Sequence, residues 1–153
     1  KLSKQKPKFK GLLTTGNIEK QKVYAIKPLT FMNNSGTAIK ELIDYFKIES
    51  KDVIVFHDDM DIDFGKIKTK FGGSSAGHNG IESIDKFIGK DYSRVRIGIG
   101  KPNGKANVVD HVLKDFDEEE KTELENITKS ITNSLSILLD KKLDLFSSTV
   151  NNK

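Results

Sequence analysis

The chain has 153 residues, 35% hydrophobic and 31% charged, so it is long enough to bury a core and has the composition of one globular domain spanning 1–153. No apolar run approaches the roughly 20 residues that cross a bilayer, which argues against a membrane protein. The absence of cysteine excludes disulfides and thiolate chemistry and is compatible with a cytoplasmic location.

The net charge of +4 is unevenly distributed along the chain. Residues 1–27 carry eight lysines and one glutamate, residues 41–63 carry eight acids and two lysines, and residues 66–105 carry nine basic residues and three acids. This segregation is typical of a polyanion-binding face beside an acidic site, and equally of a lysine-rich protein with ordinary hydrated surfaces.

Hydrophobic patterning predicts alternating strands and helices, which indicates an α/β layered fold. The run at 53–56 favours a central strand, and the alternation at 66–71 a strand near a sheet edge. Gly16-Asn17 is typical of a turn, and Asn34 or Ser35 is a candidate helix cap. We predict strands at 23–26, 53–56, 66–71 and 94–100, and helices at roughly 37–47, 81–88, 108–113 and 117–140.

Acidic residues follow the predicted strand at 53–56. Asp58, Asp59, Asp61 and Asp63 suit three interpretations: a divalent metal site, one carboxylate that orients a histidine, or a hydrated turn. Asp58 is the best single candidate because it lies nearest the strand end, where α/β sheets place their sites.

Two further loops carry candidate polar groups. Asn33 in FMNNSG offers an amide that can bind an ester carbonyl, although consecutive asparagines are also typical of turns. FGGSSAGHNG, residues 71–80, has neither the spacing of a dinucleotide or Walker loop nor the context of a serine nucleophile. It presents His78 and Asn79 at a helix start, where a histidine is also a candidate cap.

Taken together, these motifs are specific. KPLTFMNNSG, VFHDDMDIDFGKIKTKFGGSSAGHNGIESI, YSRVRIGIGKP and VVDHVL, within residues 23–113, resemble the bacterial-type peptidyl-tRNA hydrolases in order and spacing. The resemblance implies a three-layer α/β/α fold with a mixed, mainly parallel central sheet. It also implies a monomer that hydrolyses the ester between peptide and tRNA without a metal or other cofactor.

The resemblance assigns roles residue by residue. It implies that Asp58 keeps a histidine general base in its basic form, and that Asn33 and Asn79 position the substrate. Other matching positions imply contacts with peptidyl-tRNA: Phe31, Met32 and His78 line the site for the 3′ end, and Lys70 and Arg96 bind phosphates of the backbone.

The sequence departs from the family at its beginning. No Thr-Arg-His-Asn motif is present, and His57, His78 and His111 lie in other contexts. We therefore expect the N-terminal portion, with a central strand and the catalytic histidine, to be absent from this chain. The alternative is a non-catalytic RNA-binding relative of the same fold; a metal-dependent phosphohydrolase built on the aspartates is a third class.

Overall fold

The computed structural model describes residues 1–152. The packing of the chain divides it into two compact units, residues 1–54 with 71–93, and residues 55–70 with the chain from residue 94 on. Among the described residues, no helix combines the length and the apolar character of a membrane span.

Unit 1 contains an antiparallel sheet of β1 (Lys6–Lys8), β2 (Gly11–Ile18) and β3 (Gln21–Pro28). The turn between β2 and β3 lies at residues 19–20. Gly16 and Asn17 pair with Val23 and Lys22 in the ladder, so the prediction of a turn at Gly16-Asn17 was wrong. Their neighbours supply the β-branched and apolar residues that favour a strand.

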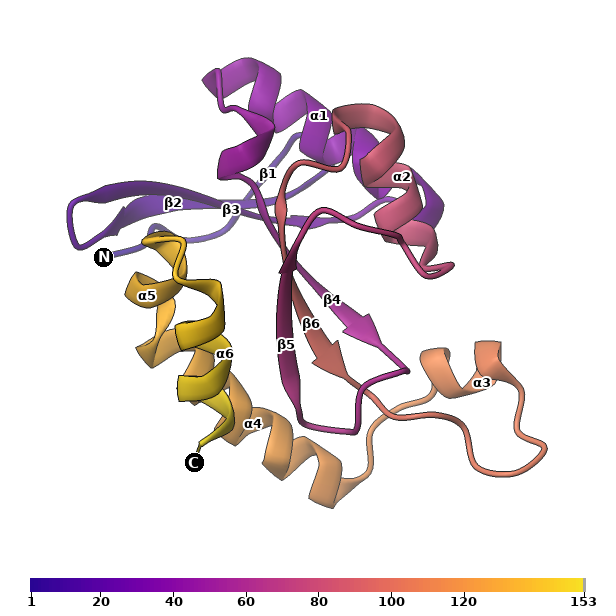
Figure 1. The fold of residues 1–153 in the computed structure, drawn as a ribbon. Coiled ribbons are helices and arrows are strands. Elements are labelled where there is room, and N and C mark those ends of the chain that lie inside the picture. Colours follow the sequence, from indigo (N-terminus) through magenta and orange to yellow (C-terminus); the bar gives the residue numbers. More distant parts are fainter. Residues whose placement is uncertain (153) are drawn as a thin grey trace. The chain divides into compact units, whose positions relative to one another are not determined.

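The helices of unit 1 are α1 (Ser35–Phe46) and α2 (Asn79–Ile88), with the short 3₁₀ turns η1 (Met32–Asn34) and η2 (Ser50–Asp52). Figure 1 shows α1 and α2 side by side. Their apolar faces form the core of the unit. Its buried residues include Leu13, Ala38, Ile39, Leu42, Ile43, Ile81 and Ile84.

One detail of α1 differs from the prediction. Asn34 occupies the N-cap position, but its side chain caps no backbone N–H. Ser35 does not cap the helix either, because its hydroxyl donates to the Met32 carbonyl at 2.8 Å. The 3₁₀ turn that precedes α1 supplies the local hydrogen bonds instead, with Asn34 N–H donating to Phe31 O at 2.9 Å.

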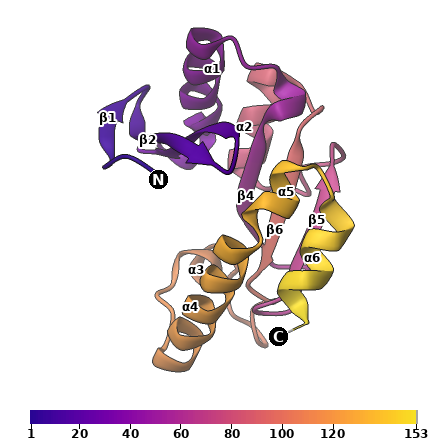
Figure 2. The ribbon, with the colours of Figure 1, turned by 90° about the vertical axis from the view of Figure 1, so that its left-hand side faces the viewer.

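A second sheet has the order β4 (Ile54–Asp59), β6 (Ser93–Gly98), β5 (Ile67–Phe71), and most of it belongs to unit 2. Figure 2 shows β6 between the other two. Ile99 N–H donates to Asp59 O at 3.0 Å, and Gly98 N–H donates to Lys66 O at 2.8 Å. Ser93 N–H also donates to Val53 O, and Gly72 N–H donates to Tyr92 O. The four bonds show that β4 runs parallel to β6 and that β5 runs antiparallel to it. The α/β class with a mixed sheet is confirmed.

Among the described residues, β4 lies at an edge of this sheet and β6 in its centre, whereas the apolar run at 53–56 favours a central strand. Phe56 is accordingly 43% exposed, whereas Val95 on β6 is fully buried. An apolar run alone does not distinguish a central strand from an edge strand. The prediction of an edge strand at 66–71 is confirmed, and Ile67 provides its buried face.

The remaining helices of unit 2 are α3 (Val108–Leu113), α4 (Glu118–Asn133), α5 (Leu135–Leu139) and α6 (Leu143–Asn151). The single helix predicted at 117–140 is therefore two, because Ser134 leaves the helical conformation (φ −108°, ψ 5°). α4 starts with a capping box in which the side chains of Asp117 and Glu120 accept each other's backbone N–H at 2.8 and 3.0 Å.

α6 lies along the free edge of β5. The Asn151 side chain accepts from the N–H of Ile67 at 2.9 Å and donates to its carbonyl at 2.8 Å, as a neighbouring strand would. The hydroxyl of Thr69 donates to Leu143 O at 3.0 Å. The two Asn151 bonds satisfy backbone groups that an edge strand otherwise leaves unpaired.

Candidate active site

The predicted residues Phe31, Met32 and Asn33 lie in unit 1, on the turn that joins β3 to α1. Phe31 is 85% exposed and Met32 56% exposed, and Asn33 is exposed as well. Large apolar side chains at such exposure contribute little to the core. The turn therefore presents an apolar surface and an amide to solvent.

The other predicted pair in this unit lies at the start of α2. The Nδ1 atom of His78 accepts hydrogen bonds from the N–H groups of Gly80 and Ile81 at 3.1 and 3.2 Å, so His78 is the N-cap. Because Nδ1 accepts, this ring carries its hydrogen on Nε2. Asn79 is the first helical residue and is exposed.

The structure brings these two loops together. A Cβ atom at Gly80 would lie 2.6 Å from Met32 Sδ, so the Met32 side chain packs closely against the start of α2. Behind this contact, Gly36 N–H donates to Ser83 Oγ at 2.9 Å in the buried α1–α2 interface. The two asparagine-bearing turns are thus anchored on one pair of packed helices.

Asp58 lies in unit 2, near the end of β4. The Nδ1–H group of the preceding residue, His57, donates to the Asp58 carbonyl at 2.8 Å. Asp58 also lines a cavity of about 160 Å³, whose other walls include Ile99, His111, Val112 and Phe116. A half-buried carboxylate beside a small cavity can orient a basic group.

The carboxylate of the next residue, Asp59, is held by two neighbouring groups. Its Oδ2 atom lies 2.9 Å from Arg96 Nε, and its Oδ1 atom accepts from Asp61 N–H at 2.9 Å. Burial raises the pKa of Asp59, but the Asp61 N–H and the Arg96 guanidinium outweigh burial and hold this pKa below its ordinary value. Both carboxylate oxygens have partners, and no group of three potential metal ligands exists among the described residues.

Lys70 and Arg96, the predicted phosphate ligands, lie on β5 and β6 of unit 2. Arg96 uses Nε for Asp59, which leaves its two terminal nitrogens for another anion. The side chain is 24% exposed and fixed by the ion pair. The sequence motifs contained no sign that Arg96 pairs with the acidic turn, because the two residues are 37 positions apart.

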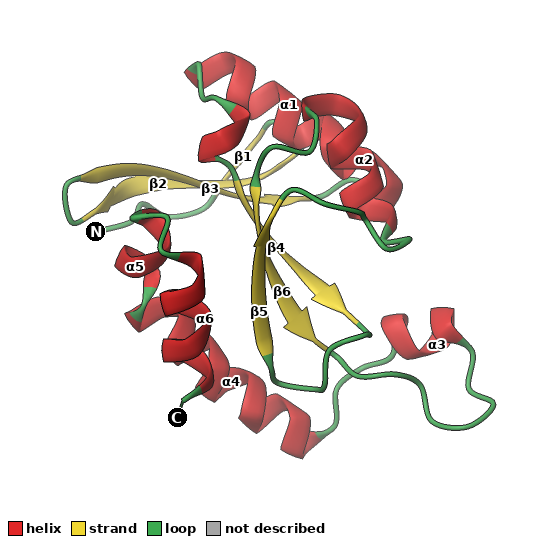
Figure 3. Ribbon diagram, in the orientation of Figure 1, coloured by secondary structure: helices red, strands yellow, loops and turns green. Residues whose placement is uncertain are grey.

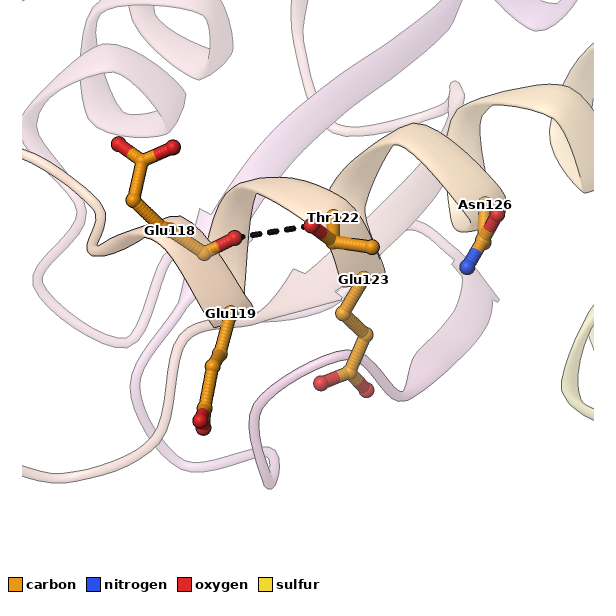
Figure 4. A pocket seen from close by; sticks show the side chains of 5 residues that line it. All are labelled: Glu118, Glu119, Thr122, Glu123 and Asn126. Carbon is orange, nitrogen blue, oxygen red and sulfur yellow. Dashed lines mark hydrogen bonds between the residues drawn. The ribbon is translucent and has the colours of Figure 1, made fainter.

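A shallow hollow on α4 contains none of the predicted residues. Glu118, Glu119 and Glu123 surround it, with Thr122 and Asn126, and Thr122 donates to the Glu118 carbonyl at 2.9 Å (Figure 4). Glu118 and Glu119 lie in the first turn of α4, where acidic side chains complement the helix dipole. Their charge repels nucleic-acid phosphates, so this hollow does not suit an RNA ligand.

Comparison with known proteins points to one family. The family model described as peptidyl-tRNA hydrolase matches residues 1–153. A peptidyl-tRNA hydrolase of Pelagibacter ubique is 79% identical over 99% of this chain and 82% of its own length. One from Ehrlichia canis is 44% identical over 96% of this chain and 75% of its own length.

Solved structures agree. The crystal structure of peptidyl-tRNA hydrolase from Acinetobacter baumannii superposes with a TM-score of 0.86 at 32% identity, covering 97% of this chain and 76% of that one. The match of the family model shows the family, and it does not support the expectation that a portion of the domain with the catalytic histidine is lacking.

Proposed function

The chain belongs to the peptidyl-tRNA hydrolase family, and on this premise we propose that it hydrolyses the ester bond between peptide and tRNA in peptidyl-tRNA, which recycles tRNA during translation. The observation that carries the proposal is the similarity to the Pelagibacter ubique peptidyl-tRNA hydrolase, which is 79% identical over 99% of the chain. We further propose a single cytoplasmic domain that acts as a monomer and uses no cofactor.

In the proposed mechanism, water is the nucleophile and attacks the ester carbonyl. A general base takes the proton of that water; the family resemblance implies a histidine in this role, which Asp58 would hold in its basic form, and none of His57, His78 and His111 is assigned to it. Asn33 and Asn79 bind the ester and the water through their amide groups, which can both donate and accept. Exposure of both asparagines on anchored turns supports this assignment.

We give the role of base to none of His57, His78 and His111. Each commits one ring nitrogen to the backbone: His57 to a carbonyl, His78 to two N–H groups and His111 to two carbonyls. For His78, protonation of Nδ1 would remove the cap of α2. None of the three lies in the Thr-Arg-His-Asn context in which the family resemblance places the base.

The substrate contacts divide into two kinds. Phe31 and Met32, with His78 beside them, provide an apolar wall for the 3′ end of tRNA, where exposed bases stack on aromatic side chains. Lys70 and Arg96 provide positive charge for phosphates, whose contacts are independent of sequence. This division predicts that salt weakens tRNA binding through the second group only.

The test is release of a labelled N-blocked amino acid from N-blocked aminoacyl-tRNA by the purified protein. We expect free N-blocked amino acid and intact deacylated tRNA, with turnover. Binding of the tRNA without release would instead support the non-catalytic RNA-binding relative. Cleavage within the RNA would contradict both readings.

A further inference from the structure

His111 is the one histidine of the chain that lines the same cavity as Asp58. It lies on α3, and its Nε2 atom is 2.7 Å from the carbonyl oxygen of Gly100 and 3.2 Å from that of Ile99. Both partners can only accept, so Nε2 carries a hydrogen and donates to the two oxygens.

The residues that accept this hydrogen are themselves fixed to the acidic turn. Ile99 N–H donates to Asp59 O at 3.0 Å, and Gly100 N–H donates to Ile62 O at 2.9 Å. The end of β6 therefore links β4, with its Asp58, to the His111 side chain. Through these bonds, His111 connects α3 to the strand end beside the candidate catalytic carboxylate.

α3 has few other means of staying in place. None of its six residues is buried, and Val109 and Leu113 are 59% and 77% exposed. A long loop separates it from β6 (Figure 3). Asn107 Oδ1 caps its start by accepting from Val109 N–H at 2.9 Å, and beyond its C-terminal end Phe116 packs on Phe64 at 6.0 Å between ring centroids and Lys114 lies 3.6 Å from Glu120.

We propose that His111 is a positioning residue, which holds α3 against the end of β6 and so closes the cavity beside Asp58. The inference rests on the proposed function, because it concerns the same site. A substrate that binds only when α3 is docked has an apparent affinity reduced by the docked fraction, while saturating substrate restores the docked form. Loss of the His111 contact therefore raises KM and leaves kcat nearly unchanged.

The test compares three variants of the whole chain. His111→Phe fills similar space but cannot donate, His111→Gln keeps an N–H donor, and Asp110→Asn is the control, an exposed neighbour on α3 that does not line the cavity. Hydrogen exchange of the α3 amides needs no substrate, and release from N-blocked aminoacyl-tRNA gives KM and kcat.

For His111→Phe we expect faster exchange in residues 108–113 and a KM raised roughly fivefold, with kcat within about twofold. His111→Gln and Asp110→Asn should have exchange rates, KM and kcat near those of the unaltered protein.

Unchanged exchange in His111→Phe would show that His111 does not hold α3. Faster exchange with an unchanged KM would overturn the link to the site, and a glutamine variant that behaves like phenylalanine would overturn the donor role. If the unaltered protein releases nothing, the proposed function fails, while the exchange result still decides whether His111 holds α3.

Discussion

Arg96 Nε lies 2.9 Å from Asp59 Oδ2, and the two side chains are only 24% and 10% exposed. This ion pair joins β6 to the last residue of β4, one residue after Asp58. It explains why consecutive aspartates can differ in role: Asp59 is tied to the scaffold, while Asp58 lines the cavity. The Arg96 guanidinium is thereby held in a fixed position.

The first prediction concerns stability. Arg96→Ala should lower the free energy of unfolding by roughly 1–3 kcal/mol, because it leaves the largely buried Asp59 carboxylate without its charged partner. Lys101→Ala is the matched control, since Lys101 pairs with Asp61 at 3.6 Å with both side chains more than half exposed. Its effect should be below about 1 kcal/mol. Urea unfolding of both variants measures the difference, and equal losses would show that the buried pair contributes nothing special.

The second prediction concerns pH. The pKa of Asp59 lies below its ordinary value of 3.8 in the folded protein, so ionised Asp59 stabilises the fold. This contribution is fully present above 3.8 and is lost as the pH falls through the lower, folded pKa. Between about pH 5 and about pH 2, the unaltered protein should lose stability more steeply than Asp59→Asn, which cannot titrate at this position. Parallel curves from urea unfolding at each pH would rule out this contribution.

The third prediction concerns the cap of α2. His78→Ala should cost about 1 kcal/mol, because the N–H groups of Gly80 and Ile81 lose their acceptor, whereas His78→Asn should retain most of the stability. Since Asn79 is the next residue, His78→Ala should also slow peptide release. Thermal unfolding and the release assay check both parts. An alanine variant with unchanged stability and activity would show that the His78 cap neither stabilises α2 nor positions Asn79.

Local patterns predicted the elements whose periodicity is strong. Strict alternation at 94–100 and apolar spacing at 108–113 correspond to β6 and α3. β2 was not predicted, because Gly16 and Asn17 are typical turn residues that here are held in a ladder by β3. α6 was missed for a similar reason: its serines and threonine have modest helix propensity, and its place depends on the bonds from Asn151 to Ile67.

The candidate site shows the same division. Asp58, Asn33 and Asn79 each had a plain structural alternative in the sequence, and only the combination of three motifs in order indicated a function. The contact between Met32 and the start of α2 depends on the packing of α1 against α2. The hydrogen bond from His111 to the Gly100 carbonyl depends on the loop between β6 and α3, which brings α3 back to the end of β6. Neither leaves a periodic signal in the sequence.

The fourth prediction concerns metals. Both carboxylate oxygens of Asp59 already have partners, and the proposed mechanism uses water that a histidine deprotonates. Peptide release should therefore be the same with and without EDTA, after correction for effects of Mg²⁺ on the tRNA itself. Loss of activity on chelation, restored by one divalent ion, would favour the metal-dependent class instead.

The central claim is that Asp58 serves catalysis and its acidic neighbours do not. The most direct measurement compares Asp58→Asn with Asp61→Asn in single-turnover release from N-blocked aminoacyl-tRNA. Asp61 is a matched control because it lies on the same turn with a side chain 53% exposed. We predict a loss of about 10²- to 10⁴-fold in rate for Asp58→Asn with binding of tRNA retained, and a change within about twofold for Asp61→Asn. Equal rates in the two variants would contradict the account.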